Sequence, residues 1–450
     1  MIKNLISATD RSILKNVLIV TPLSLMGRAG TLLIYAILAN WFGVNPGMDF
    51  LYYHWGVAIF LVELLSSASV YSVLIPLLTE ERAKSHAAAN ACLRAIFSVY
   101  LICMGGLCCV FSTLSYLITR FFLPQPNLHA KAMLGIILGF TFFTIVASVR
   151  WLFKAVLDAY QQFYLPVIMH GLRVPLVIGL IYTLKGSLGL FSIVFALIIG
   201  ELFQGMVLFI ACRFSLKMTG LFGIAGWRSY EKMGQFIKQC ITMMGAAISD
   251  GMNPVVDRGM ASSVGIGSVS KLDYTLKLCA IPETVTGVIM PVLLSHWSAI
   301  SADADLQQLR YSVWKGILVL LALMGPVIFG FYHFRIAIVE LLYGHGVMEK
   351  PERLHVASLF GIYLIGTLPR LISRLLIRAH LALRNTTFIF SATVIRTILN
   401  PFLNLVFMKL WGLEGIAFST ALLSFPLTAY IGIAFWLVSH RKGVERKGNG

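Results

Sequence analysis

One stretch departs from the otherwise apolar pattern of this sequence: residues 250–297, which read DGMNPVVDRGMASSVGIGSVSKLDYTLKLCAIPETVTGVIMPVLLSHW. It leaves one apolar segment, passes through a Gly/Ser-rich connection and enters a second apolar segment. Its ionisable residues include Asp257, Arg258, Lys271, Asp273, Lys277 and Glu283. An ionisable side chain at the centre of a bilayer costs about 2.5–3.5 kcal/mol, so it usually faces protein or a water-filled pathway. This stretch and a counterpart at residues 28–76 therefore indicate a transporter.

The composition is that of a polytopic helical membrane protein. Of 450 residues, 58% are hydrophobic and 12% are charged, and the mean hydropathy is +0.83. Lys and Arg number 36 against 19 Asp and Glu. Because these cations lie mostly in connections or near span ends, they predict orientation in a membrane rather than nucleic-acid binding. The first fifteen residues are too polar for a cleavable signal.

Apolar runs of spanning length predict an all-α protein with twelve transmembrane helices. The predicted helices cover residues 14–41, 50–78, 92–118, 132–157, 164–184, 188–212, 233–256, 270–296, 312–332, 355–380, 387–408 and 414–438. With the N-terminus placed inside, Lys and Arg concentrate on the cytoplasmic side, as the positive-inside rule requires. We therefore expect both termini in the cytoplasm.

The predicted helices divide into two halves. We expect an N-terminal six-helix lobe at 1–213, a cytoplasmic interfacial linker at 214–232, a C-terminal six-helix lobe at 233–440 and a basic cytoplasmic tail at 441–450. A faint repeat supports this division, because Tyr52 follows Gly43 at the same spacing as Tyr274 follows Gly265. Secondary transporters commonly contain internal repeats with a substrate site between them.

Several blocks resemble the MurJ/MviN-type lipid II flippases of the multidrug/oligosaccharidyl-lipid/polysaccharide exporter superfamily. They are WFGVNPGMD at 41–49, SVLIPLLTE at 72–80, VVDRGMASSVGIGSVSKLDYTLKL at 255–278 followed by IP and MPVLLS, LLYGHG at 341–346, and RAHLALRNTT at 378–387. The resemblance implies two six-helix lobes around a central cationic cavity that opens alternately to the two sides of the membrane. It also implies outward movement of a polyprenyl-pyrophosphate-linked glycan.

The sequence departs from that family at several positions. Members usually carry a further arginine on helix one and a pair on helix two, where this chain has Ile34 or Tyr35 and Val62-Glu63. An arginine early in helix eight corresponds to Lys277. The peptidoglycan flippases add two helices after helix twelve, and we expect no counterpart of these two helices here. We therefore expect that the chain does not replace a peptidoglycan flippase and that it carries a different polyprenyl-linked glycan.

Arg28 is the first candidate for substrate binding. It lies near mid-depth of the first predicted helix, between Gly27 and Gly30, and a guanidinium holds phosphate oxygens in a bidentate manner. An ion pair with Glu63 is the structural alternative. Asp49 is a further candidate for a gating or ion-pair role.

Two more candidates share one face of the eighth predicted helix. Asp273 and Lys277 are four residues apart, so they can form an ion pair, and Lys277 can alternatively bind phosphate. We expect Asp257 and Arg258 at the external mouth, in a gate or in a solvated loop, with Arg258 assisting substrate binding. Asp250 is a candidate for ion coupling.

Basic residues also line the last predicted helices. Arg396, Asn400 and Asn404 recur every fourth residue, and we expect Arg396 on the cavity wall as a substrate contact. Arg370 and Arg374, with Arg378, form a second stripe after Pro369. This second stripe either anchors the cytoplasmic end or recruits the anionic headgroup from the inner leaflet.

The function expected from these residues is that of an inner-membrane flippase rather than an enzyme. GIGSVS lacks the Lys-Ser/Thr of a phosphate-binding loop, and we expect no nucleotide, metal or other cofactor. The expected partners are a polyprenyl-pyrophosphate-linked glycan, membrane lipids and a coupling H⁺ or Na⁺, without nucleic acid, and the expected state is a monomer in the bacterial inner membrane. A cation-coupled multidrug exporter and a transport-inactive scaffold for glycan synthesis are the alternatives.

Overall fold

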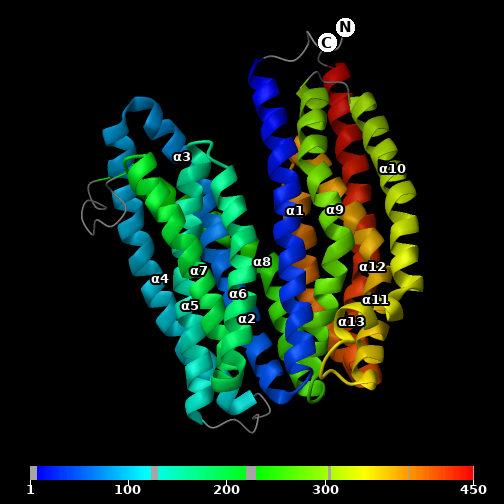
Figure 1. Ribbon diagram of the computed structural model, residues 1–450. Helices are drawn as coiled ribbons and strands as arrows, with labels where there is room; N and C mark the ends of the chain where they lie inside the picture. The colour runs from blue at the N-terminus through cyan, green and yellow to red at the C-terminus, as the bar shows by residue number, and fades with distance from the viewer. Residues whose placement is uncertain (1–7, 123–129, 219–229, 303–305, 384, 449–450) are drawn as a thin grey trace. The chain divides into compact units, whose positions relative to one another are not determined.

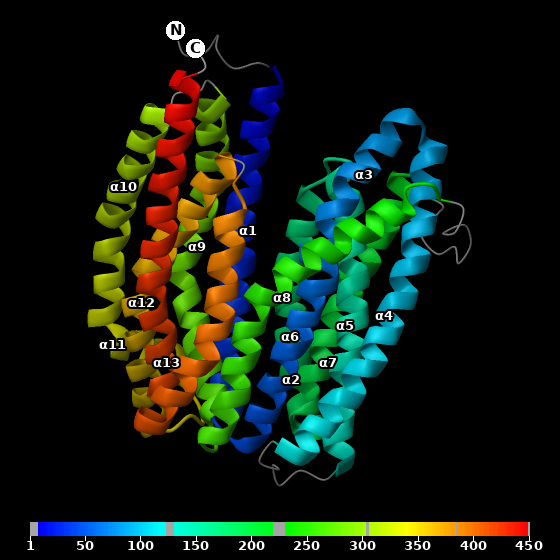
Figure 2. The same cartoon turned by 180° about the vertical axis from the view of Figure 1, so that it is seen from behind.

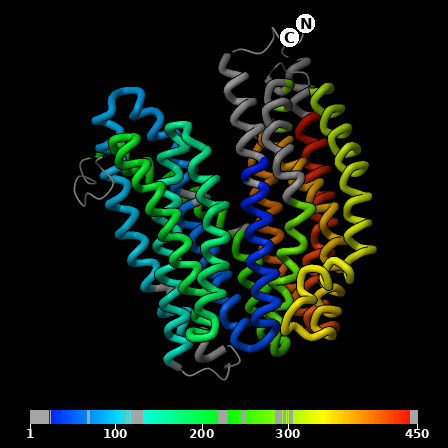
Figure 3. The backbone as a smooth tube through the Cα atoms, in the orientation of Figure 1, coloured from blue at the N-terminus to red at the C-terminus, as the bar shows by residue number. Residues whose placement is uncertain are grey.

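The computed structural model describes residues 8–122, 130–218, 230–302, 306–383 and 385–448 (Figure 1). Within these residues the chain is helical and contains no strand. Figure 2 shows the same helices from behind, and Figure 3 follows the backbone as a tube.

The first part of the chain forms long helices with two short π-helical stretches, η2 and η3. The elements are α1 (Ala8–Phe42), α2 (Pro46–Val62), η2 (Glu63–Val70), α3 (Tyr71–Lys84), α4 (His86–Phe122), α5 (Ala130–Ala159), α6 (Tyr164–Leu188), α7 (Phe191–Ile210) and η3 (Ala211–Ser215). The helix is continuous through α2, η2 and α3, because η2 joins them without a turn.

The second part begins with α8 (Met233–Val264) and α9 (Ser268–Ala302), which a tight turn connects. Gly267 has a φ of +83° in this turn, a conformation that residues with a side chain rarely adopt. The remaining elements are α10 (Leu306–His333), α11 (Arg335–Tyr343), α12 (Lys350–Ala382) and α13 (Thr387–Gly448). Gly412, with a φ of +58°, divides α13 into two helical segments.

The predicted helical segments fall on these helices, apart from the start of 188–212, where Gly189 ends α6 with a positive φ. Nine helices among the described residues are long and apolar enough to span a membrane. This chain is therefore a helical, multi-pass protein, and the count of twelve crossings stays a prediction.

The chain forms two compact units. Unit 1 contains Met1–Ile34 and Pro46–Gly251, and unit 2 contains Tyr35–Asn45 and Met252–Gly450. The first part of α8 therefore packs with unit 1, although the predicted C-terminal lobe begins at residue 233. That the predicted lobes act as the moving bodies of a transport cycle stays a prediction. Residues 219–229 of the expected interfacial linker and the side chains of the tail at 441–450 lie outside the described residues.

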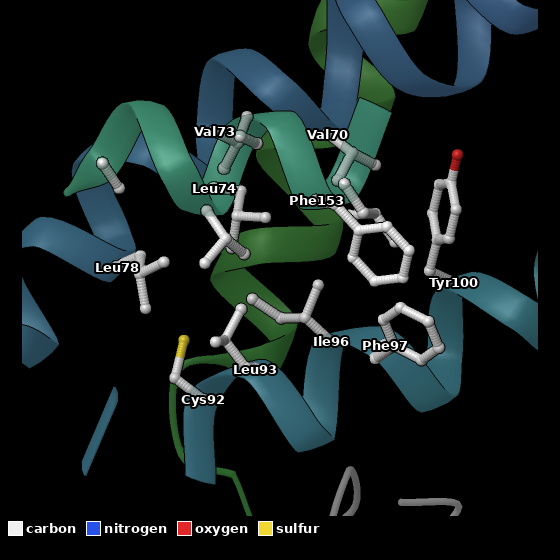
Figure 4. Close-up of a cluster of buried hydrophobic side chains, with 14 of the residues drawn as sticks. Val70, Val73, Leu74, Leu78, Cys92, Leu93, Ile96, Phe97, Tyr100 and Phe153 are labelled. Atoms are coloured by element: carbon white, nitrogen blue, oxygen red, sulfur yellow. The ribbon is translucent and has the colours of Figure 1, made fainter. Parts of the chain in front are cut away.

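Apolar side chains at helical spacing hold α3 against its neighbours in unit 1 (Figure 4). Leu74 and Leu78 are fully buried and face Leu93 and Ile96 of α4. Phe153 of α5 joins this cluster, which fixes the three helices together. In unit 2, α12 packs against both α9 and α13. These packed helices place the charged residues described below.

Candidate functional site

A buried ion pair joins α8 to α9 in unit 2. Arg258 donates from Nε to both oxygens of Asp273, at 3.1 and 3.0 Å, and from Nη2 to Oδ1 at 2.7 Å. Arg258 Nη1 also donates to the carbonyl oxygen of Pro254 at 3.2 Å. Both side chains are buried. The pairing is bidentate, the geometry in which an arginine binds a carboxylate most specifically.

The alternative of a solvated loop for Asp257 and Arg258 is therefore wrong, whereas their place at the external mouth and a role in a gate stay predictions. The predicted helix stopped at residue 256, whereas α8 continues to Val264. Both residues consequently lie inside a helix, and their side chains are buried among partners of unit 2.

Asp257 faces the polar stripe of α13. Asn400 and Asn404 donate to Asp257 Oδ1 at 2.7 and 2.6 Å, and Ser419 donates to Asn404. The spacing of four residues thus places both amides on one face, as the sequence indicated. Arg396 lies one turn earlier, half-buried and close enough to interact with the charge of Asp257.

Lys277 lies against an aromatic ring of the same unit. Its Nζ is 4.5 Å from the centre of the Tyr35 ring, a distance typical of a cation–π contact. Tyr35 and Ile34 are buried at the positions where the resemblance placed a family arginine. Asp273, the predicted partner of Lys277, is held by Arg258, and a role of Lys277 in binding substrate stays a prediction.

The end of α1 is fixed within unit 2 by backbone contacts. Asn40 donates from Nδ2 to the carbonyl oxygen of Leu342 at 2.8 Å and accepts from the His345 amide at 2.9 Å. Tyr274 donates to the carbonyl oxygen of Gly43 at 2.9 Å. Asp49, at the start of α2 in unit 1, is half-buried, and its predicted gating role is untested.

Arg370 and Arg374 of α12 share a carboxylate that the sequence alone did not assign to them. Glu283 of α9 lies 2.7 Å from Arg374 Nη2 and 3.6 Å from Arg370 Nη2. Arg370 also donates to Thr367 Oγ1 at 3.0 Å. The stripe is therefore partly neutralised within the protein, and its predicted role in recruiting a headgroup stays a prediction.

Arg28 belongs to unit 1, where its side chain is exposed. A Cβ added at Gly27 would lie 2.6 Å from His170 Cδ2, and one at Gly30 would lie 2.6 Å from Val174 Cγ2. The two glycines therefore allow α1 to approach α6 closely on either side of Arg28. Glu63, at the start of η2, is also exposed, and its predicted pairing with Arg28 stays a prediction.

Unit 1 contains a buried ion triad that the sequence analysis missed. Arg150 of α5 and Arg173 of α6 each form an ion pair with one oxygen of Glu201 on α7. The three helices lie side by side (Figures 1 and 2). Each residue falls inside a predicted span, and a charge at such a position is itself a signal of function.

The side chain of Asp250, the candidate for ion coupling, lies outside the described residues, although its backbone belongs to α8. Among the residues whose side chains are described, no three or more His, Cys, Asp or Glu residues gather closely enough to hold a metal ion. The cationic members of the described clusters are guanidinium and ammonium groups, which bind carboxylates and phosphates.

Residues 38–448 match the model of the family described as "Lipid II flippase MurJ". The chain is 24% identical over 426 residues to a protein of Borreliella burgdorferi named "Probable lipid II flippase MurJ", covering 91% of this chain and 80% of that one. It is 21% identical over 420 residues to the Burkholderia cenocepacia protein "Lipid II flippase MurJ", covering 91% of this chain and 81% of that one.

Two solved structures share the fold. A structure named "Lipid II flippase MurJ, inward closed conformation" superposes with a TM-score of 0.78 at 18% identity, covering 95% of this chain and 91% of the other. An inward-facing MATE family multidrug resistance transporter of the MOP superfamily superposes with a TM-score of 0.72 at 10% identity, covering 96% of each chain. The all-α polytopic fold expected from the sequence is confirmed, and the count of twelve transmembrane helices stays a prediction.

Proposed function

The chain belongs to the lipid II flippase MurJ family, and from this premise we propose that it moves a polyprenyl-pyrophosphate-linked glycan across the membrane. The family match over residues 38–448 is the observation that carries the proposal. Movement is outward, from the inner to the outer leaflet of the bacterial inner membrane, with both termini in the cytoplasm. The hydrophilic headgroup passes through the protein by alternating access while the polyprenyl tail stays in lipid.

The charges of the helices support an anionic substrate. Arg28 in unit 1 and Lys277 in unit 2 are the proposed contacts of the pyrophosphate, with Arg396 and Arg258 assisting in unit 2. Arg258 is paired with Asp273 in this structure, so we assign it the role of shaping the site until this ion pair opens. A guanidinium suits a phosphate because its N–H groups match the spacing of two phosphate oxygens.

The transport cycle needs a source of free energy. We assign this source to a gradient of H⁺ or Na⁺, with Asp250 as the coupling carboxylate. The protein acts as a monomer in this scheme. The chain performs no covalent chemistry in this scheme. The multidrug exporters that share the fold are the alternative, but organic cations call for acidic and aromatic contacts, whereas the proposed contacts here are basic.

Reconstitution tests the proposal. Purified protein is placed in vesicles that carry a polyprenyl-pyrophosphate-linked disaccharide with a fluorescent label on the sugar, and dithionite then bleaches the label in the outer leaflet. Active protein should let bleaching proceed beyond the fraction seen in protein-free vesicles. Arg28→Ala should abolish this gain, and Arg94→Ala, which alters an exposed arginine of α4, should preserve it. Movement of ethidium without movement of the lipid would support the multidrug exporter instead.

A further inference from the structure

The ion triad of unit 1 contains more positive than negative charge. Arg150 and Arg173 share the single carboxylate of Glu201. The exposed fractions of these side chains are 10% for Arg150, 12% for Arg173 and 3% for Glu201. A buried charge that lacks a counter-charge is strongly unfavourable, and within a membrane span such a group usually serves a ligand pathway. One additional anion would balance the triad.

Arg173 has donors to offer to that anion. Its guanidinium carries five N–H groups, and Nη1 is the group that pairs with Glu201. Its Nε is buried and has no hydrogen-bond partner among the residues that the structure describes. The absence of a side chain at Gly200 lets the stem of Arg173 lie against α7, since a Cβ there would come within 3.0 Å of Arg173 Cγ.

Arg28 lies close to the same part of α6. Gly27 packs directly on His170, which lies one turn before Arg173 on α6. Arg28, Arg150 and Arg173 all lie within electrostatic range of His170, so three cationic groups belong to the same region of unit 1. Arg28 is the exposed member of this group, and Arg150 and Arg173 are largely buried.

We infer that Arg28 and Arg173 form an anion site in unit 1 for a phosphate group of the transported lipid, and that Glu201 is the counter-ion with which this phosphate competes. The inference rests on the proposed function, since it names a contact of the proposed substrate. Arg173 contacts the phosphate in this scheme. Arg150 is a positioning residue, because it holds Glu201 through the other carboxylate oxygen.

A binding experiment separates this site from a purely structural triad. Full-length protein in detergent is titrated with inorganic pyrophosphate and, separately, with farnesyl pyrophosphate, and affinity is read from the shift in thermal unfolding. Arg173→Gln should weaken the binding of both probes by roughly tenfold or more, because it removes hydrogen bonds between charged groups. Glu201→Gln should strengthen binding, by about threefold or more, because it removes the competing charge. Arg94→Ala should leave both affinities unchanged.

The direction in which Glu201→Gln changes the affinity for the probes distinguishes an anion site from a purely structural triad. If folded Glu201→Gln protein binds either probe no better than the wild type, the triad only ties three helices together and the inference is wrong. Should Arg173→Gln fail to fold, Arg173→Lys replaces it, with weaker binding expected because the fork geometry is lost. Binding of inorganic pyrophosphate without farnesyl pyrophosphate would overturn the assignment to a lipid-linked phosphate.

The same protein samples distinguish this inference from the proposed function. If the wild-type protein binds farnesyl pyrophosphate and moves the labelled lipid, and Arg173→Gln and Glu201→Gln leave the affinity unchanged, the site in unit 1 is contradicted. The proposed function is not contradicted by that result. Wild-type protein that binds neither probe and moves no lipid contradicts both the site and the proposed function.

Discussion

Arg258 of α8 and Asp273 of α9 form a bidentate ion pair across the turn that joins the two helices. The pair is buried within unit 2, and Asp257, the residue before Arg258, binds a different partner set on α13. Successive residues of α8 therefore connect this helix to α9 and to α13. The consequence is that the part of α8 from Met252 onward is fixed in unit 2 by charged hydrogen bonds rather than by apolar packing alone.

Removing one member of this pair should destabilise the protein. Asp273→Ala leaves the Arg258 guanidinium buried without its carboxylate, and breaking a buried pair in this way costs about 3–5 kcal/mol. Thermal unfolding in detergent should show a clearly lowered transition. The double variant Arg258→Leu with Asp273→Leu should recover most of the loss, since no charge is then left unpaired. Equal stability of Asp273→Ala and the wild type would contradict the pairing.

Each hydrogen bond to the Asp257 carboxylate should contribute more to the free energy of unfolding than a hydrogen bond between neutral groups. Asn404→Ala removes a donor to a buried carboxylate, for which about 1.5–3 kcal/mol is expected. The matched control is Asn45→Ala, whose side chain donates to the Phe42 carbonyl oxygen at 2.8 Å and should cost about 0.5–1.5 kcal/mol. Unfolding transitions of the two variants measure the difference. A larger loss in Asn45→Ala would refute this ranking.

Transport should depend on the contact of Lys277 with the face of the Tyr35 ring and not on the Tyr35 hydroxyl. Tyr35→Phe keeps the aromatic face and should preserve the transport rate. Tyr35→Leu removes a contact that is worth about 0.5–2 kcal/mol and leaves the ammonium group without it. Transport of labelled lipid in vesicles should therefore fall in Tyr35→Leu. A similar fall in Tyr35→Phe would show that the hydroxyl, and not the ring, is the important group.

The twelve-span topology can be tested by labelling single cysteines, placed in a cysteine-free background, from outside intact cells. The concentration of Lys and Arg on one side predicts that positions in 122–130 and 345–352 react, while 220–230 and the C-terminal tail are protected. Permeabilised cells supply the control, in which all positions should react. With the N-terminus in the cytoplasm, external labelling of the tail would overturn the count, because an odd number of crossings would then be required.

Much of the fold follows from the sequence, because apolar runs of spanning length predict helices and Gly/Ser-rich segments predict turns. The connection at 265–267 and the stripe of Asn400 and Asn404 are examples, since both depend only on local spacing. The extension of α8 to Val264 was not predicted, because the charged residues Asp257 and Arg258 interrupt the apolar run that defined the span.

The partners of the charged residues could not be predicted, because they depend on tertiary packing. Glu283 and Arg374 are 91 residues apart, and Arg150 and Glu201 are 51 apart, so no helical periodicity links them. Asp273 illustrates the limit most clearly. Local spacing favoured Lys277 as its partner, whereas the fold of α8 against α9 brings Arg258 to it.

The residues that replace a family arginine on α1 predict a restricted substrate. Ile34 and Tyr35 are buried apolar or aromatic residues at positions where the resemblance placed an arginine, so this chain offers fewer cations there. We expect that it does not sustain growth when a host's peptidoglycan flippase is depleted, even at verified levels in the membrane. Normal wall synthesis under depletion would show that the substitutions do not restrict the substrate.

The selectivity of lipid movement tests the central claim most directly. Vesicles containing wild-type protein are given, in separate samples, labelled polyprenyl-pyrophosphate-linked disaccharide, its polyprenyl-monophosphate counterpart and phosphatidylglycerol, and dithionite bleaching is followed for each. The proposed function predicts rapid movement of the pyrophosphate-linked lipid, slower movement of the monophosphate and none of phosphatidylglycerol above protein-free vesicles. Equal rates for all three lipids, or no movement of the first, would contradict it.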